Sequence, residues 1–82
     1  MFLSRPSGQE KNVSRILMNI ILNGEQTAIT SQTLSAMIKE KGFNPDTVIA
    51  EVNVQLIKKD DWEQTPLVEG DRVELLSFVG GG

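Results

Sequence analysis

The chain has 82 residues, of which 39% are hydrophobic and 23% charged, as expected for one small globular domain. It contains no cysteine and no histidine, which excludes disulfides, thiolate nucleophiles and the commonest general base near neutral pH. The remaining Asp, Glu, Lys, Ser and Thr residues form no recognisable nucleophile–base pattern. We therefore expect that the chain by itself is not an enzyme.

Charge is unevenly distributed along the chain, whose net charge is −3. Basic residues predominate in residues 1–17 and acidic residues predominate after them. An acidic body argues against nucleic-acid binding and suits a basic partner surface. No apolar run approaches the roughly 20 residues of a membrane span, and residues 1–17 lack the apolar segment of a secretory signal. We expect no membrane contact and a cytoplasmic location.

Residues 1–17 are expected to be a flexible extension, because Pro6-Ser7-Gly8 and the polar residues after it favour irregular structure. A strand is predicted from Ile16 to Leu22, with Met18, Ile20 and Leu22 on one face and Asn19, Ile21 and Asn23 on the other. Asn23-Gly24 is the residue pair that a type I′ turn prefers. A second strand, Glu25 to Ile29, completes the predicted hairpin.

A helix is predicted after this hairpin. The segment Thr30–Thr33 supplies N-cap residues, and Leu34, Met37 and Ile38 have the spacing of a buried helix face. Basic residues in the last turn, Lys39 and Lys41, complement the helix dipole, and Gly42 suits the left-handed position that follows a helix.

The middle of the chain predicts a second hairpin. After a turn at Asn44-Pro45-Asp46, the segment Thr47 to Val52 is predicted to be a strand. Its inward residues are Val48, Ala50 and Val52, and its outward residues are Ile49 and Glu51. Asn53 is expected to open a tight turn into a short strand, Gln55 to Ile57.

One helical turn is predicted at Asp60-Asp61-Trp62-Glu63, with Trp62 covering the sheet edge. A hard cation on Asp60, Asp61 and Glu63 is conceivable. Adjacent carboxylates of this kind are more typical of a solvated face, so we expect no metal site.

The last strand is predicted from Arg72 to Val79, after a turn at Glu69-Gly70-Asp71. Val73 and Leu75 have the parity of core residues, whereas Glu74, Leu76 and Phe78 point outward. Outward Leu76 and Phe78, together with Ile21 and Ile49, predict an apolar patch for a partner. The alternative is that N-terminal residues fold back over them.

The order of elements is strand, strand, helix, strand, short strand, turn and strand. It predicts an α+β domain at residues 18–79, with one helix packed across a mixed sheet of four to five strands. For the helix to cover one face, the first and last strands should be parallel neighbours in the middle. This is the β-grasp (ubiquitin-like) arrangement.

The chain finishes with Phe78-Val79-Gly80-Gly81-Gly82. Glycine has no Cβ, so residues 80–82 are expected to form a thin, flexible tail. Our hypothesis is that the carboxylate of Gly82 is the reactive group and that the domain presents it. The alternative is a frayed end or a linker remnant.

Residues 18–82 resemble the sulfur carrier protein of thiamine biosynthesis, the ThiS family. The matching pieces are Met18-Asn19-Ile20, Asn23-Gly24-Glu25, Thr33-Leu34, Val52-Asn53, Trp62, Leu67, Glu69-Gly70-Asp71-Arg72-Val73-Glu74 and Phe78-Val79-Gly80-Gly81-Gly82. The chain departs from the family at Asn53-Val54, where Asn-Gly is usual. This departure concerns turn geometry and leaves the tail unchanged.

The resemblance implies that an adenylating enzyme of the ubiquitin-activating type uses ATP and Mg²⁺ to activate Gly82. A cysteine desulfurase or rhodanese-type donor then supplies the sulfur of a thiocarboxylate, and thiazole synthase takes it into the thiazole of thiamine. The chain itself would bind no cofactor. Gly80 and Gly81 would thread into the partner, and the partner would contact Leu76, Phe78, Val79, Ile21 and Ile49.

Three other functions stay open. The small subunit of molybdopterin synthase shares the fold and tail, but its usual ending has prolines and a serine before Gly-Gly. A protein modifier would be conjugated to lysines through Gly82, and a plain interaction domain would have an inert tail.

Overall fold

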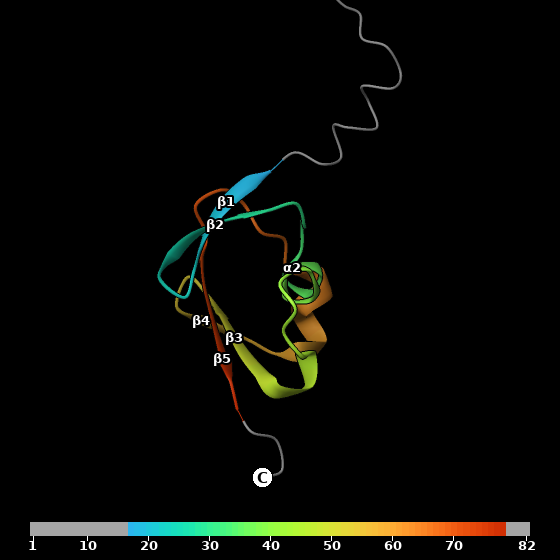
Figure 1. The fold of residues 1–82 in the computed structure, drawn as a ribbon. Coiled ribbons are helices and arrows are strands. Elements are labelled where there is room, and N and C mark those ends of the chain that lie inside the picture. The colour runs from blue at the N-terminus through green and yellow to red at the C-terminus, as the bar shows by residue number, and fades with distance from the viewer. Residues whose placement is uncertain (1–16, 79–82) are drawn as a thin grey trace, which may run out of the picture.

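The computed structural model describes residues 17–78, which form one mixed sheet, one α-helix and two 3₁₀ turns (Figure 1). In chain order the elements are β1 (Met18–Leu22), β2 (Glu25–Ile29), α2 (Leu34–Glu40), η1 (Pro45–Thr47), β3 (Val48–Val52), β4 (Gln55–Ile57), η2 (Lys59–Gln64) and β5 (Arg72–Ser77). The predicted order of strands and helix is confirmed. No helix in this part of the chain is long and apolar enough to cross a membrane.

The five strands of the described sheet lie in the order β2-β1-β5-β3-β4. The two central strands, β1 and β5, run parallel, with Ile21 opposite Arg72 and Leu22 opposite Val73. All other neighbours are antiparallel. The predicted parallel pairing of the first and last strands is confirmed, and the fold is a β-grasp. Its last strand therefore ends in the middle of the sheet.

Both hairpins turn through two residues with positive φ. In the first turn φ is 50° at Asn23 and 85° at Gly24, as expected for type I′. In the second turn φ is 52° at Asn53 and 71° at Val54. The turn therefore keeps its geometry although valine replaces glycine. A β-branched residue is strained in this region of φ, and Val54 is also 83% exposed.

Helix α2 lies on one side of the sheet (Figure 1). The Thr33 hydroxyl caps its start by accepting a hydrogen bond from the amide of Ala36 at 3.2 Å. Three of its side chains are fully buried: Leu34, Met37 and Ile38. Gly42 has a φ of 83° just after the helix. The predicted N-cap, apolar face and terminating glycine are all confirmed.

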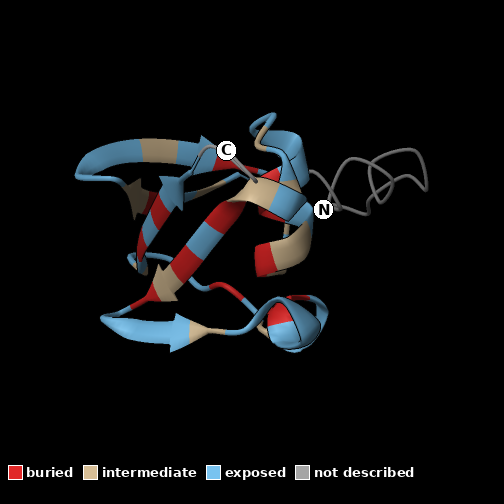
Figure 2. Ribbon diagram, turned by 90° about the horizontal axis from the view of Figure 1, so that it is seen from below, coloured by how far each residue is buried: buried red, intermediate tan, exposed pale blue. Residues whose placement is uncertain are grey.

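The core lies between this helix and the sheet, and buried and exposed residues alternate along the strands (Figure 2). Strand residues contribute Ile20, Ile29, Val48, Ala50, Val52, Val73 and Leu75. Trp62 on η2 is also buried, and its indole N–H donates to the carbonyl of Ile57 at 3.0 Å. This bond satisfies the polar end of Trp62 next to β4, so the prediction that it covers the sheet edge is confirmed.

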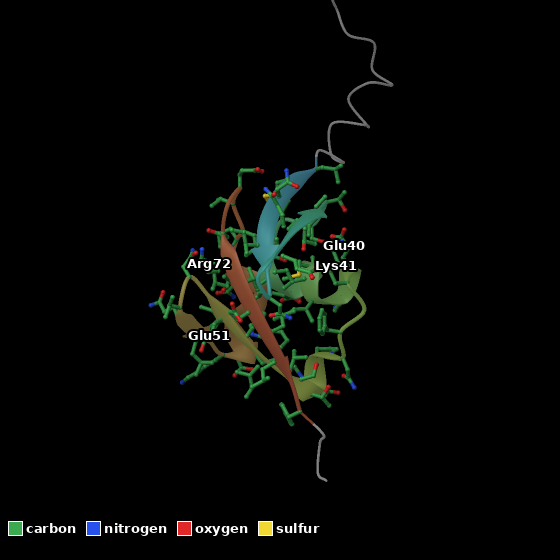
Figure 3. All side chains as sticks on the ribbon, turned by 60° about the vertical axis from the view of Figure 1, so that its left-hand side comes forward. Glu40, Lys41, Glu51 and Arg72 are labelled. Carbon is green, nitrogen blue, oxygen red and sulfur yellow. The ribbon has the colours of Figure 1, made fainter. Side chains whose placement is uncertain are left out.

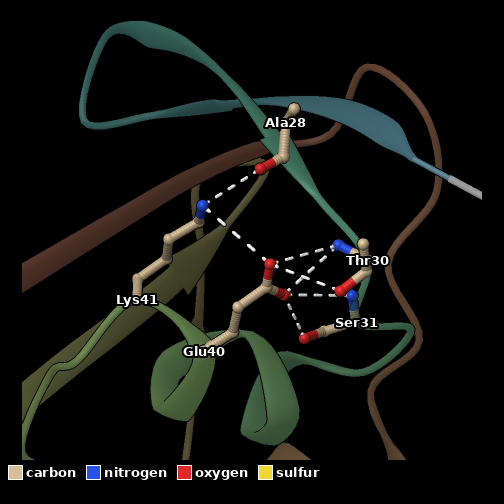
Figure 4. A network of polar contacts seen from close by, with 5 residues as sticks. All are labelled: Ala28, Thr30, Ser31, Glu40 and Lys41. Atoms are coloured by element: carbon tan, nitrogen blue, oxygen red, sulfur yellow. Dashed lines mark hydrogen bonds and ion pairs between the residues drawn. The ribbon is translucent and has the colours of Figure 1, made fainter. Parts of the chain in front are cut away.

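Glu40, the last residue of α2, ties the helix to the loop that precedes it (Figure 4). Its carboxylate accepts hydrogen bonds from the amides of Thr30 at 3.3 Å and Ser31 at 3.1 Å, and from the Ser31 hydroxyl. Burial raises the pKa of Glu40, but the hydrogen bonds from Ser31 and Thr30 and the charge of Lys41 outweigh it. The pKa of Glu40 therefore lies below its ordinary value, and the ionised carboxylate stabilises the loop.

Three strand boundaries differ from the prediction. Strand β1 begins at Met18, while Ile16 lies outside the described residues. Thr47 belongs to η1 because its amide donates to the carbonyl of Asn44 at 3.0 Å, which closes a turn before β3 begins. Strand β5 ends at Ser77, and Val79 lies outside the described residues. The predicted extension and glycine tail also fall largely or wholly outside them.

Candidate functional site

The last strand has two chemically different faces. Val73 and Leu75 point toward the helix and are 0% and 6% exposed. Glu74, Leu76 and Phe78 point away from the helix and are exposed. The predicted parity of β5 is confirmed. The side of the sheet that α2 does not cover is called the outward face below.

An apolar patch occupies the outward face near the end of β5. Ile49 on β3 lies directly opposite Leu76, and these side chains are 44% and 66% exposed. Phe78 is 46% exposed, and its amide donates to the carbonyl of Thr47 at 2.8 Å. The backbone therefore follows β3 up to the last described residue. The structure brings together three of the predicted partner residues: Ile49, Leu76 and Phe78.

Ile21 lies elsewhere on the same face. It is opposite Arg72, four residues and so about 13 Å along β5 from Leu76. With Gly24, Gln26, Arg72 and Glu74 it lines an open depression of about 540 Å³. Ile21 therefore belongs to this depression beside the first hairpin turn. Arg72 and Glu74 lie between Ile21 and Leu76 along β5, so Ile21 is not part of the apolar patch.

Leu56 on β4 extends the apolar surface and was missed by the sequence analysis. It is 62% exposed and pairs with Glu51 across the β3–β4 hairpin. The sequence could have predicted this position, because a two-residue turn at Asn53-Val54 fixes the register of the hairpin. That register places Leu56 on the same face as Glu51.

Two acidic residues lie next to the apolar patch, and one of them, Glu74, also lines the depression. Glu51 on β3 is directly opposite Glu74 on β5. Like charges at this separation destabilise a sheet, and within residues 17–78 neither carboxylate forms an ion pair. Figure 3 shows Glu51 and Arg72 on the side of the sheet away from Glu40 and Lys41 of the helical side. A partner with a basic group near Glu51 and Glu74 would relieve their repulsion.

Asparagine side chains from both hairpin turns hold β5 in place. The Asn53 side chain accepts from the amide of Arg72 and donates to the carboxylate of Asp71, each at 3.0 Å. The Asn23 side chain accepts from the amide of Leu75 at 2.8 Å. The sequence predicted these asparagines as turn residues, but their second role depends on strand positions that only the fold reveals.

The remaining predicted site residues are Val79, Gly80, Gly81 and Gly82, which lie outside the described residues. Their roles stay predictions. Within residues 17–78 no group of three acidic side chains is placed to hold a metal ion, including Asp60, Asp61 and Glu63 on η2.

A β-grasp domain whose central last strand leads to a glycine-rich end defines the class of small ubiquitin-like proteins. The model of the ThiS family matches residues 20–82. The chain belongs to the ThiS family.

Curated relatives include two proteins named thiazole synthase. One, from Paramagnetospirillum magneticum (strain ATCC 700264 / AMB-1), is 32% identical over 66 residues, and the other, from Magnetococcus marinus (strain ATCC BAA-1437 / JCM 17883 / MC-1), is 35% identical over 66 residues. Each match covers 79% of this chain and 20% of the relative. This chain therefore spans about a fifth of the length of these relatives.

The solved structures similar to this chain include a crystal structure of the thiamine biosynthesis protein ThiS from Geobacter metallireducens. It has a TM-score of 0.68 and 26% identity, and the match covers 79% of this chain and all of that protein. A solution structure of a thiamine biosynthesis protein from the same organism has a TM-score of 0.66 and 25% identity, with 79% and 88% covered. Both support the β-grasp assignment.

Proposed function

We propose that this chain is a sulfur carrier of thiamine biosynthesis and that the carboxylate of Gly82 carries the sulfur. The observation that supports this most is the ThiS family match, which continues through the glycine-rich end to residue 82. The chain has no cysteine, so it cannot hold sulfur as a persulfide on a side chain of its own.

The proposed reaction activates a carboxylate, which is a poor electrophile. An oxygen of the Gly82 carboxylate attacks the α-phosphorus of ATP, and pyrophosphate leaves with the electrons of the broken P–O bond. A sulfur nucleophile from the donor then attacks the carbonyl carbon, and AMP leaves. When that nucleophile is a persulfide of the donor, its attack leaves an acyl disulfide. A thiol then attacks the donor-side sulfur, so the S–S bond breaks, the thiocarboxylate leaves with its electrons and the donor is released as a disulfide with that thiol. ATP and Mg²⁺ belong to the adenylating enzyme, and this chain supplies the carboxylate.

The residue types of the tail suit entry into a separate active site. Three extended residues span at most roughly 10 Å, at about 3.3–3.6 Å per residue. Gly80, Gly81 and Gly82 have no Cβ, so a narrow channel could admit them. The apolar patch and Glu74, immediately before the tail, are proposed to contact the enzyme.

The choice of thiamine over molybdopterin rests on the relatives. Two proteins named thiazole synthase each contain a stretch similar to this chain that makes up a fifth of their length. A carrier-like segment within such a protein favours the thiazole ring as the sulfur acceptor. The ending Ser77-Phe78-Val79-Gly80 also lacks the prolines expected of the molybdopterin protein. Thiazole synthase is therefore the proposed acceptor enzyme.

The test measures both steps. The chain is incubated with ATP, a sulfide source and a candidate adenylating enzyme, and ATP–pyrophosphate exchange and intact mass are recorded. We expect exchange and a mass increase equal to the difference between sulfur and oxygen, mapped to Gly82. Gly81→Ala or one residue added after Gly82 should abolish exchange, whereas the control Gly8→Ala should behave as the unmodified chain.

Two results would contradict the proposal: normal exchange by the Gly81→Ala variant, or no mass change with active enzyme and donor. Thiazole formation by thiazole synthase with the thiocarboxylated chain would support the thiamine pathway. Molybdopterin formation instead, or lysine-linked adducts of Gly82, would support the alternative carriers and refute thiamine.

A further inference from the structure

Strand β5 continues beyond the strand that it pairs with on one side. The parallel pairing of β1 with β5 ends at Leu22 and Val73. The chain then turns back at Asn23-Gly24, whereas β5 continues to Ser77 (Figure 1). On its other side β5 pairs with β3 throughout, from Val73 to Ser77.

Hydrogen bonds show which way each residue of β5 directs its backbone. The amide of Phe78 donates to Thr47 at 2.8 Å, and the carbonyl of Arg72 accepts from Asn53 at 2.7 Å. Backbone groups alternate in direction along an antiparallel pair, so residues 72, 74, 76 and 78 face β3. Residues 73, 75 and 77 face the other way. Consistent with this, the amide of Leu75 donates to the Asn23 side chain at 2.8 Å.

Three backbone groups remain after Asn23 has bonded to Leu75. They are the carbonyl of Leu75 and the amide and carbonyl of Ser77, and they face the side where β1 has already ended. Within residues 17–78 no strand or loop pairs with them. We call these three groups the free edge. An unpaired strand edge of this kind is a template for another extended chain.

We propose that the free edge binds an extended segment of the adenylating enzyme as an added strand beside β5. The proposal rests on the sulfur-carrier function, because the free edge lies immediately before the tail that must enter that enzyme. Main-chain hydrogen bonds would supply affinity, and alternate side chains would supply specificity.

The outward side chains beside the free edge define the chemistry of this segment. Glu74 and then Leu76 follow each other on the outward face of β5, and Glu74 is directly opposite Glu51. Asn23 lies beside Glu74 and bonds to Leu75, so the added strand begins after it. It should therefore carry an apolar residue next to Leu76 and, at its end nearest Glu74, a basic residue. A second copy of this chain is disfavoured, because its Glu51 and Glu74 would add to the acidic repulsion.

Residue-resolved amide hydrogen exchange tests the added strand directly. In the free chain, the Ser77 amide should exchange rapidly while the Leu76 amide, which faces Ile49 of β3, is protected. Saturation with an adenylating enzyme that is active on this chain should slow exchange at Ser77 by about tenfold or more. Unchanged exchange at Ser77 in the complex would overturn the proposal. Protection that grows with chain concentration alone would indicate a second copy and would also overturn it.

Two matched variants of Ser77 test the contribution of its backbone amide to binding. Ser77→Pro removes an amide that the described fold does not use, and the extended backbone at Leu76 suits a residue before proline. Loss of one hydrogen bond should weaken binding to the enzyme by about three- to tenfold. Ser77→Ala should bind as the unmodified chain. Equal affinity of a folded Ser77→Pro variant would contradict the added strand, and if that variant does not fold, hydrogen exchange decides.

The charge of the added strand has its own test. Glu74→Gln should weaken binding and reduce its dependence on salt concentration, whereas the control Glu63→Gln on η2 should leave both unchanged. An unaltered salt dependence in Glu74→Gln would refute the basic residue.

The mass measurement at Gly82, made on the same samples, separates this proposal from the sulfur-carrier function. A thiocarboxylate that forms while Ser77 stays unprotected would refute the added strand alone. Absence of any thiocarboxylate with active enzyme and donor would refute the carrier function, and the added strand with it.

Discussion

The two faces of this sheet differ in what they do for the protein, and neighbouring residues of β5 show the difference most simply. Leu75 and Leu76 are the same residue type on the same strand, yet they are 6% and 66% exposed. Strand alternation places Leu75 against the helix and Leu76 on the outward face. The covered face therefore determines stability, and the outward face is available for a partner.

The largest expected effect is the loss of stability when the buried leucine of this pair is truncated. Leu75→Ala should destabilise the protein by about 2–4 kcal/mol, because it removes buried contacts and leaves a cavity. Leu76→Ala should change the free energy of unfolding by less than about 0.5 kcal/mol. Urea denaturation of both variants measures the difference. For binding to the adenylating enzyme we expect the opposite: among folded molecules, Leu76→Ala should bind more weakly than Leu75→Ala.

Equal destabilisation by the two substitutions would show that the outward face is covered in solution. That outcome would favour the alternative in which N-terminal residues fold over Leu76 and Phe78.

Asn23 in the first hairpin turn also contributes to stability, because its side chain bonds to β5. Asn23→Ala should destabilise the protein by about 2 kcal/mol, because the amide of Leu75 loses its acceptor and alanine tolerates positive φ less well than asparagine. Asn23→Asp keeps an acceptor oxygen and the tolerance for this φ, so it should retain most of the stability. Thermal unfolding checks the ranking, and hydrogen exchange at Leu75 should be faster in Asn23→Ala. An aspartate variant as unstable as the alanine variant would contradict this account.

Much of the fold was predictable because local rules decide it. Asn23-Gly24 predicted the first turn, the spacing of Leu34, Met37 and Ile38 predicted the helix, and alternation along β5 predicted both of its faces. In each case the signal lies within a few residues of the feature. The family resemblance, based on longer stretches, is supported by the family match.

The features that escaped prediction depend on residues far apart in sequence. The Asn23 side chain meets an amide 52 residues away, and the free edge exists only because β1 ends before β5 does. Glu40 meets the amides of Thr30 and Ser31 because a helix brings them together. Periodicity assigns residues to faces, but it does not supply register or the lengths of paired strands.

A smaller effect concerns how the helix is held over the covered face. Glu40→Gln should destabilise the protein by about 1 kcal/mol at pH 7, because an NH₂ group takes the place of one acceptor oxygen and the negative charge is lost. The effect is modest because the site is partly exposed to solvent. The pKa of Glu40 is lower in the folded protein than its ordinary value. Its contribution is therefore complete above the unfolded-state pKa, near 4.3, and is lost as pH falls through the folded-state pKa.

Denaturant unfolding at pH 7 and at successively lower pH measures this dependence. The difference between Glu40→Gln and the unmodified chain should shrink below about pH 4. Glu63→Gln, an exposed substitution on η2, should not show this pattern. A difference that stays constant down to low pH would show that the ionised carboxylate is not what stabilises the loop.

The smallest expected effect lies at the tip of the second hairpin, where Val54 has a φ of 71° and is 83% exposed. Because so little of the side chain is buried, it offers little packing to offset its backbone strain. Val54→Gly should stabilise the protein by about 1–2 kcal/mol through relief of strain. It should also destabilise the protein by about 0.5–1 kcal/mol, because glycine gives the unfolded chain more entropy. The net gain of about 0.5–1 kcal/mol should raise the Tm by roughly 4 °C. Val54→Thr keeps the branched Cβ and should leave the Tm unchanged. A lower Tm for Val54→Gly would mean that valine makes a contact at this turn that outweighs its strain.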